Sequence, residues 1–328
     1  MSGRLAPRLL LAGLSLLLTF VLAEAVLHLA GVDYSPMRVE DQRDDRTQHL
    51  FDSESFVYDP VLIWKPRAGS GVFNRQGYRG DELTVDKPAG ALRVATVGDS
   101  NTLGWQGTAG AHWPGDLERL LRATDDRHRV INAGVWGYSS HQGVARLARV
   151  LPLEPDLVTI SFGSNDAHPV AVADGAYSGD SIRPRAWKKS IGSLRLGRLL
   201  LGAVAAGSGR STHVVPTQRV PLDDYRANLR RMIAMTREAG ARPVLLTRPY
   251  LDSVPEPPRW KALAPSYNAA TVEIGAAEGI PVVDFYSLFK GRGELFADES
   301  HFTAEGHRIA AAILHQRLRP HLVQTPAG

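Results

Sequence analysis

Short apolar runs alternate with amphipathic stretches from residue 92 to about residue 318, and this pattern constrains the fold more than any other feature. The apolar runs predict strands at 92–97, 129–132, 157–162, 243–247 and 281–285. The amphipathic stretches predict helices at 113–123, 141–150, 223–239, 266–278 and about 304–318. Strands that are apolar throughout and alternate with helices are typical of parallel sheets covered on both faces. We therefore expect an α/β fold with three layers, α/β/α, around a central parallel sheet of about five strands.

Polar residues stand where the predicted strands end. In open parallel sheets, ligands bind beyond the carboxyl ends of the strands. A serine, two candidate oxyanion donors and an Asp–His pair are therefore expected at one sheet edge. The segments that supply them follow the first three strands or precede the last helix: 98–101 (Gly-Asp-Ser-Asn), 132–137, 163–166 (Gly-Ser-Asn-Asp) and 298–301 (Asp-Glu-Ser-His).

The residue types in these segments fit nucleophilic acyl transfer. A serine hydroxyl needs a base within hydrogen-bonding distance, and His301 is the candidate base for Ser100. Asp298, three residues before His301, can hold the second ring nitrogen and stabilise the imidazolium. The amide of Gly137 and the side chain of Asn165 are candidates to complete an oxyanion hole with the amide of Ser100.

Each of these residues also has an ordinary structural interpretation. In isolation, Ser100 fits a helix N-cap or a turn, and His301 is one of eleven histidines. Asn165 fits a turn, and Gly137 fits a glycine in the left-handed region. The catalytic interpretation is favoured because all of them occur in this order, at the ends of the first, second, third and last strand units.

The same segments resemble the sequence blocks of the SGNH hydrolases, also called GDSL esterases and lipases. The resemblance extends over about residues 93–314. It implies the flavodoxin-like SGNH hydrolase fold, with Ser100 as nucleophile and first oxyanion donor. It also implies that Asp298 and His301 complete a catalytic triad. The blocks that carry the resemblance are 97–102, 132–139, 163–166 and 298–301.

The resemblance also bears on the remaining oxyanion donors. It assigns the second donor to Gly137, with Gly134 as the competing choice, and the third to the side chain of Asn165. The sequence departs from the Gly-Asp-Ser-Leu string, because Asn101 and Thr102 occupy the leucine region. We expect this variation to touch no catalytic role.

Within the first 32 residues, an apolar segment follows two arginines, Arg4 and Arg8. Residues 9–23 carry no charge, and the apolar character continues to Val32, interrupted by Glu24 and His28. The length lies between that of a signal-peptide core and that of a membrane span. Residues 23–25 (Ala-Glu-Ala) have the small-x-small form of a cleavage site, but the apolar run continues past them. We expect an uncleaved anchor with the body on the exported side, or a secreted protein if the segment is cleaved.

The composition of residues 33–328 suggests three parts. Residues 33–90 are expected to be a membrane-proximal segment that packs on the catalytic domain, and within it 58–80 resembles the pre-domain of membrane-anchored bacterial SGNH members. Residues 91–320 are expected to be the catalytic domain, and 321–328 a C-terminal tail. The basic stretch 183–198, inserted between the third and fourth strands, fits either a solvated loop with a surface helix or a lid that contacts membrane or an anionic polymer.

Composition excludes several other classes of protein. The absence of cysteine excludes disulfides, thiolate metal sites and cysteine nucleophiles. The net charge of +4 is spread along the chain, so nucleic acid is not an expected partner. No phosphate-binding glycine motif follows the first strand, and the histidines lack zinc-type spacing. We expect neither a cofactor nor a metal.

The sequence therefore predicts a serine esterase that hydrolyses acyl esters, possibly acetyl esters, of an envelope glycan, a lipid or a small molecule. Its expected partners are this acylated substrate and, through the N-terminal helix, a membrane. Two alternatives stay open. An O-acyltransferase acting on a cell-envelope polysaccharide would use the same triad, and a non-catalytic glycan-binding protein could have the same fold.

Overall fold

A computed structural model gives the structure of the chain. Residues group into two compact units, one formed by 1–44 with 178–215 and the other by 45–177 with 216–328. We describe each unit by itself. The structure describes residues 5–31, 55–59, 61–70, 72–84, 86–104, 110–170, 173–176, 194–197, 199, 217–252, 254–255 and 257–322.

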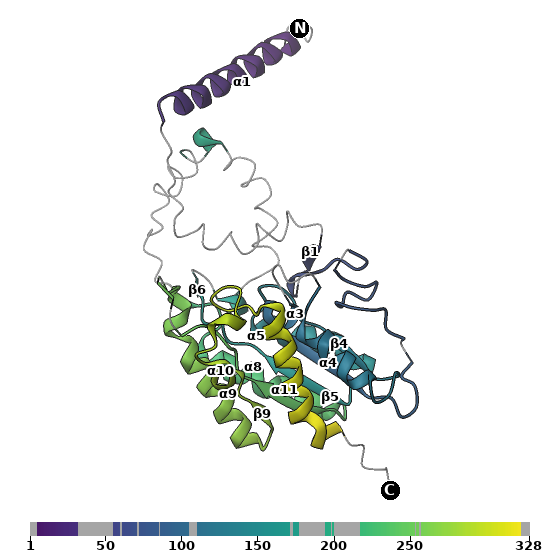
Figure 1. The fold of residues 1–328 in the computed structure, drawn as a ribbon. Helices are drawn as coiled ribbons and strands as arrows, with labels where there is room; N and C mark the ends of the chain where they lie inside the picture. The colour runs from purple at the N-terminus through teal and green to yellow at the C-terminus, as the bar shows by residue number, and fades with distance from the viewer. Residues whose placement is uncertain are drawn as a thin grey trace. The chain divides into compact units, whose positions relative to one another are not determined.

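A five-stranded parallel sheet forms the centre of the larger unit (Figure 1). The strand order is β4-β3-β5-β8-β9, and all four pairings are parallel. Strands β3 and β5 are buried along their whole length, which explains why they are apolar throughout. The predicted α/β sandwich is therefore confirmed. The strands are β3 (Arg93–Gly98), β4 (Arg129–Asn132), β5 (Leu157–Ser161), β8 (Arg242–Leu246) and β9 (Val282–Val283).

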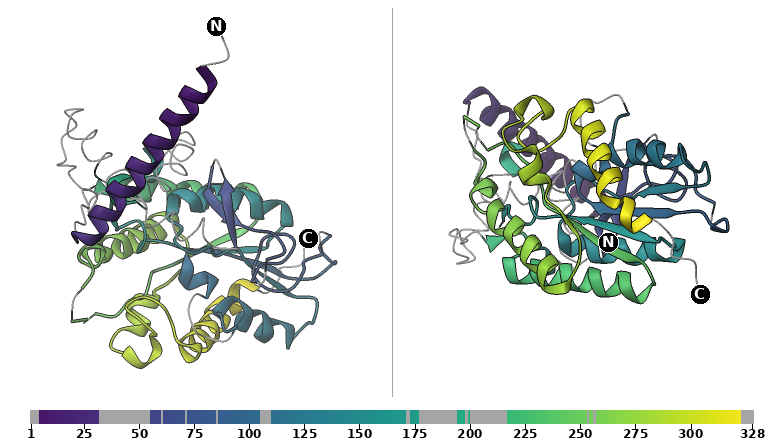
Figure 2. Two further views of the ribbon diagram at one scale, coloured as in Figure 1. Left: turned by 90° about the horizontal axis from the view of Figure 1, so that it is seen from above. Right: turned by 60° about the horizontal axis from the view of Figure 1, so that its bottom comes forward.

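Helices cover both faces of this sheet, as Figures 1 and 2 show. On one face, α4 (Trp113–Arg122) packs against α11 (Ala304–Leu322). On the other, α8 (Leu222–Glu238) packs against α5 (Ser140–Val150) and α9 (Ala264–Glu278). All five helices correspond to helices predicted from the sequence. The core on the α4 and α11 side joins buried residues of β3, β4, β5, β8 and β9 to both helices.

Several short elements were not predicted. The last predicted strand ends at Val283 instead of continuing to residue 285, because Asp284 accepts a hydrogen bond from the Ser287 amide and caps a new helix. The additional elements are β1 (Phe56–Asp59), β2 (Ile63–Pro66), α3 (Ser100–Leu103), β6 (Pro169–Val170), β7 (Thr217–Gln218), α10 (Phe285–Phe289) and the 3₁₀ turns Leu151–Leu153, Asp174–Ala176, Arg259–Ala262 and Gly293–Leu295.

The antiparallel hairpin β1–β2 and the chain after it contact the sheet and its helices closely. The Arg79 amide donates to the Asn132 carbonyl over 3.1 Å. The Tyr78 hydroxyl donates to the Arg149 carbonyl over 3.0 Å, and the Arg146 guanidinium lies over the Tyr78 ring, 4.5 Å from its centroid. The described part of residues 55–84 thus packs closely on the sheet and its helices.

The smaller unit contains the apolar helix α1 (Leu5–Leu29). Its stretch Leu11–Leu29 has a mean hydropathy of 1.9 and is long and apolar enough to cross a membrane by length and composition. The Glu24 carboxylate accepts the amide protons of Arg195 and Leu196, each over 2.8 Å. The basic stretch 183–198, for which a lid was one interpretation, lies outside the described residues except at 194–197.

Two histidines lie where α4 meets α11: His307 is fully buried, and His112, the N-cap of α4, is partly buried. His112 Nδ1 accepts the Gly115 amide proton, and His307 Nδ1 accepts that of Trp113. Burial, with a smaller contribution from the positive charge of Arg79, lowers the pKa of both histidines to about 3. Both side chains are therefore neutral in the folded chain near neutral pH.

We predict that these histidines make stability fall as the pH falls. An unfolded histidine binds a proton below about pH 6.5, whereas the folded pair does so only near pH 3. The free energy of unfolding should therefore decrease from pH 6.5 towards pH 3, by about 1.4 kcal/mol per pH unit for each histidine. Urea unfolding at several pH values should show a shallower slope for His307→Gln. The matched control His315→Gln, on the partly exposed side of α11, should keep the wild-type slope, and an unchanged slope in His307→Gln would contradict the prediction.

Candidate active site

Ser100 is the first residue of α3, immediately after the buried strand β3. Asp99 caps this helix by accepting the Asn101 amide proton over 2.9 Å. Its second carboxylate oxygen accepts from Arg248 Nε over 2.8 Å, and both side chains of this ion pair are buried. The buried ion pair of Asp99 and Arg248 therefore fixes the turn on which Ser100 lies.

Ser100, His301 and Asp298 form one chain of hydrogen bonds. Ser100 Oγ lies 2.8 Å from His301 Nε2. His301 Nδ1 lies 2.7 Å from Asp298 Oδ2 and 2.9 Å from Oδ1. The three side chains thus have the order expected from the sequence, with the imidazole between the hydroxyl and the carboxylate.

Hydrophobic and polar contacts hold the loop of Asp298 and His301 in place. Phe296 and Phe302 pair across the loop as an antiparallel bridge, and their rings lie 5.3 Å apart at the edge of the core. Asn101 Nδ2 donates to the Ser300 carbonyl over 2.9 Å, which joins the loop to the helix of Ser100. The sequence comparison treated Asn101 as a neutral variation, whereas the structure shows that its side chain connects these two segments.

The Asp298 carboxylate is strongly stabilised in its charged form. Partial burial would raise its pKa, but hydrogen bonds and the charge of His301 outweigh this effect. The amides of Ser300 and His301 also donate to Oδ1, over 2.9 and 2.8 Å. The result is a pKa of about 2, so Asp298 is an anion at neutral pH and can stabilise an imidazolium beside it.

The loop after β4 contains both glycines considered as oxyanion donors. The Gly134 amide donates to Asn132 Oδ1 over 3.1 Å, and a Cβ at Gly134 would lie only 2.4 Å from the Leu103 backbone nitrogen. Gly134 is therefore buried against α3 with its N–H already used. Gly137 has φ +70° and is partly exposed, and no group among the described residues accepts its N–H. The local geometry favours Gly137 over Gly134.

Asn165 lies beside the Gly137 loop. Its Nδ2 donates to the Tyr138 carbonyl over 3.0 Å, so the structure brings these two candidate donors together. The neighbouring Asp166 is completely buried and accepts the amide protons of Ser140 and Gly163, over 2.9 and 3.1 Å. Burial raises its pKa to about 6. Asp166 thus joins the Asn165 turn to the start of α5.

Comparison with known proteins identifies the family. Residues 96–309, more than half of the chain, match the GDSL-like Lipase/Acylhydrolase family. The chain belongs to the GDSL-like lipase/acylhydrolase family. It is accordingly a hydrolase of ester bonds. No protein of curated function matches it in sequence.

The chain is also similar to several solved structures. A lipase/acylhydrolase from Enterococcus faecalis is 23% identical with a TM-score of 0.48, and the alignment covers 70% of this chain and 96% of that one. A catalytic mutant of the acetylxylan esterase Axe2 from Geobacillus stearothermophilus is 20% identical with a TM-score of 0.46, with 69% and 94% covered. The acetyl xylan esterase AlAXEase is 16% identical with a TM-score of 0.47, with 69% and 98% covered.

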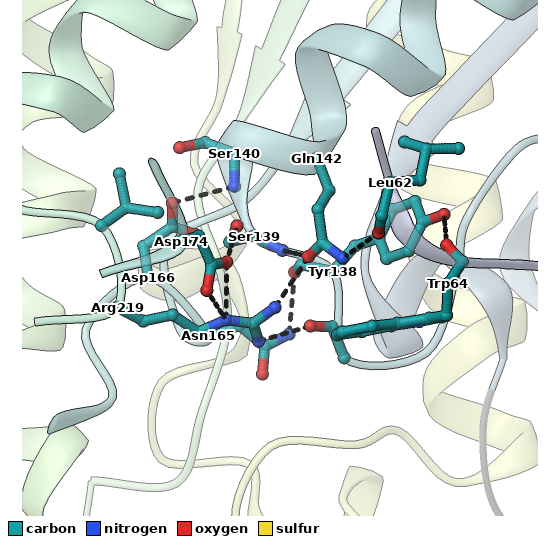
Figure 3. A network of polar contacts seen from close by, with 12 residues as sticks. Leu62, Trp64, Tyr138, Ser139, Ser140, Gln142, Asn165, Asp166, Asp174 and Arg219 are labelled. Carbon is teal, nitrogen blue, oxygen red and sulfur yellow. Dashed lines mark hydrogen bonds and ion pairs between the residues drawn. The ribbon is translucent and has the colours of Figure 1, made fainter. Parts of the chain in front are cut away.

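A buried polar network that includes Arg219 and Asp174 (Figure 3) contacts the Gly137 loop of this acylhydrolase. Its centre is Arg219, which forms an ion pair with Asp174 and also donates to the carbonyl of Gly137. Sequence reasoning missed both charged residues, because neither belongs to a block and they flank the region of the insertion. Among the described residues, no group of three or more His, Asp or Glu side chains is arranged to hold a metal ion.

We predict that Gly134→Ala destabilises the acylhydrolase. The added Cβ would meet backbone atoms of Leu103 and Thr102, at 2.4 and 2.8 Å, which cannot rotate away. Such overpacking costs roughly 1–3 kcal/mol, so thermal unfolding should begin at a lower temperature. The control Gly293→Ala has only Leu251 Cδ2 within 4 Å, at 3.8 Å, and should leave the midpoint nearly unchanged. Equal midpoints for the two variants would show that α3 is not packed against Gly134 as described.

Proposed function

We propose that the chain is a serine esterase in which Ser100, His301 and Asp298 form the catalytic triad. The observation that carries this proposal is the chain of two hydrogen bonds, 2.8 Å from Ser100 Oγ to His301 Nε2 and 2.7 Å from Nδ1 to Asp298. A nucleophile, a base and a group that orients the base are what acyl transfer through serine requires.

The reaction proceeds through an acyl-enzyme. Ser100 Oγ attacks the ester carbonyl while His301 Nε2 takes the hydroxyl proton, and the carbonyl oxygen becomes an oxyanion. The tetrahedral intermediate collapses, the ester bond to the alcohol breaks, and Nε2 returns the proton to the departing alkoxide. Water then attacks the acyl-enzyme by the same steps, releasing the acid and restoring the Ser100 hydroxyl. The Asp298 carboxylate stabilises the imidazolium in both halves.

Three N–H groups are proposed to stabilise the oxyanion: the amides of Ser100 and Gly137 and one side-chain N–H of Asn165. Asn165 Nδ2 has two hydrogens, of which one is given to the Tyr138 carbonyl, so the other is available to substrate. Fixed donors of this kind act most strongly when charge develops on the oxygen, and the removal of one typically costs on the order of 10²–10³ in rate.

The proposed substrate is an acyl ester of an envelope glycan, a lipid or a small molecule, with an acetyl ester as one candidate. The helix of Leu11–Leu29 supports an envelope location, because it is apolar enough to span a membrane and follows Arg4 and Arg8. We propose that residues 1–32 are an uncleaved anchor of the membrane-anchored bacterial type and that the body is exported. Residues 33–90 then form part of the catalytic unit of 91–320, and 321–328 form a tail.

We predict that Ser100→Ala abolishes esterase activity. The variant lacks the nucleophile, so no acyl-enzyme can form. The full chain in detergent should hydrolyse short p-nitrophenyl esters, and mass spectrometry should find an acyl group or a fluorophosphonate on Ser100. The control Ser266→Ala changes an exposed serine of α9 and should retain wild-type activity. Wild-type rates in folded Ser100→Ala would overturn the proposed mechanism.

We predict that the mature protein keeps its N-terminal helix. The apolar run continues past residues 23–25, which favours an anchor over a cleaved signal. On expression in a bacterium, the chain should remain with the membrane after a high-salt wash, and its N-terminal peptide should be recovered. Protease added to spheroplasts should remove the body. A soluble protein beginning near residue 26 would show that the segment is a signal peptide.

A further inference from the structure

The peptide that carries the proposed oxyanion N–H of Gly137 is held by a side chain from the hairpin. Trp64 Nε1, on β2, donates to the Trp136 carbonyl over 3.1 Å. That carbonyl belongs to the same planar peptide unit as the Gly137 N–H. In a trans peptide the two groups point in opposite directions, so fixing the carbonyl also fixes the N–H. Trp64 therefore sets the direction of the Gly137 N–H through the Trp136 carbonyl.

The next peptide unit is held from another part of the chain. Arg219 Nη1 donates to the Gly137 carbonyl. Glycine is the residue with the greatest backbone freedom, and Gly137 adopts φ +70°, where few other residues fit. With the peptide units on both sides of its Cα held by donors, the two dihedral angles of Gly137 lose that freedom.

All three nitrogens of the Arg219 guanidinium donate hydrogen bonds. Nε donates to both Asp174 oxygens, over 3.0 and 2.7 Å, and Nη2 donates to Gln142 Oε1 over 2.7 Å. The side chains of Arg219 and Asp174 are 2% and 1% exposed. A buried pair with this many hydrogen bonds has one well-defined geometry, because any displacement leaves a charge unpaired in an apolar interior.

The two donors also contact each other and the chain around them. The Arg219 guanidinium lies 5.5 Å from the centroid of the Trp64 ring, and the Tyr138 hydroxyl donates to the Trp64 carbonyl over 2.6 Å. Gln142 Nε2 donates to the Leu62 carbonyl over 2.7 Å, which ties the hairpin to the start of α5. The hairpin β1–β2 and the segment of Arg219, which follows β7, thus both contact the Gly137 loop.

We propose that Trp64 and Arg219 are positioning residues for the oxyanion hole, holding the Gly137 N–H in the orientation that stabilises the developing oxyanion. The proposal rests on the proposed esterase mechanism and on the role of Gly137 in it. In this proposal Trp64 and Arg219, which lie outside the four sequence blocks, affect the rate of the chemical step. Because the ground-state ester carries no full charge on its carbonyl oxygen, misplacing this donor should lower kcat more than it changes KM.

Trp64→Phe is the principal test, because it removes the indole N–H and keeps an aromatic ring. We expect kcat on p-nitrophenyl acetate to fall by about 10- to 100-fold, with KM changed less than about threefold, which is somewhat milder than the loss of a donor itself. Asn165→Ala gives the reference value for that loss. Trp113→Phe is the matched control, since it makes the same ring change at a fully buried site in the core, away from Gly137.

Arg219→Lys is the second variant. It keeps a positive charge for Asp174 but cannot also reach the Gly137 carbonyl and Gln142, so kcat should fall again. In both variants the rate of Ser100 labelling by a fluorophosphonate should fall in parallel with kcat, because the phosphoryl oxygen occupies the oxyanion hole. The pH profile of kcat/KM should keep its wild-type shape, since the His301–Asp298 pair is untouched.

The outcomes separate this proposal from the mechanism on which it depends. If wild-type Ser100 is not labelled, the esterase mechanism fails, and the positioning role fails with it. If the wild type is labelled but folded Trp64→Phe keeps kcat within about twofold, the positioning role alone is overturned. A loss of kcat in Trp113→Phe equal to that in Trp64→Phe would assign the effect to general destabilisation and would also overturn it.

Discussion

The parallel pairing of β3 with β4 on one side and with β5 on the other is the constraint on which the site depends. Thr96 is in register with Asn132, and Gly98 with Ser161, so three chain segments leave the sheet at the same edge in neighbouring positions. The loop before α11 reaches this edge because Phe296 and Phe302 anchor it to the core. Because each functional group starts from a buried, closely packed element, its position is set by the core and resists displacement.

Buried and partly buried arginines donate hydrogen bonds to the backbone carbonyls of several loops. Loops lack partners of their own for backbone carbonyls, and a guanidinium offers five N–H donors in a fixed plane. Arg79 donates to the carbonyls of Leu103 and Gly104 at the end of the nucleophile helix. Arg146 and Arg219 do the same for other turns around the sheet edge. In this way the backbone carbonyls of irregular segments gain hydrogen-bond partners.

The sheet, its helices and the residues of the candidate triad were predictable from the sequence because each depends on local patterns. Buried strands are apolar along their length, and Ser100 and His301 stand in short motifs at strand or helix ends. The choice between Gly134 and Gly137 needed coordinates, since it depends on a bond to Asn132 and on the approach of α3. The contacts of Trp64 and Arg219 depend on folding of segments more than 70 residues apart, which leave no local signal.

The candidate triad and the Gly137 loop are therefore held by different parts of the molecule. Ser100 and His301 are fixed by the sheet, by α3 and by the loop that Asn101 joins to it. The Gly137 loop is fixed instead by the hairpin and by the strands β6 and β7, which pair on either side of the insertion. A substitution at Arg219 would then act on the Gly137 loop and leave the hydrogen bonds of His301 intact. On the proposed mechanism, this arrangement separates the orientation of the Gly137 N–H from the geometry of the proposed nucleophile and its base.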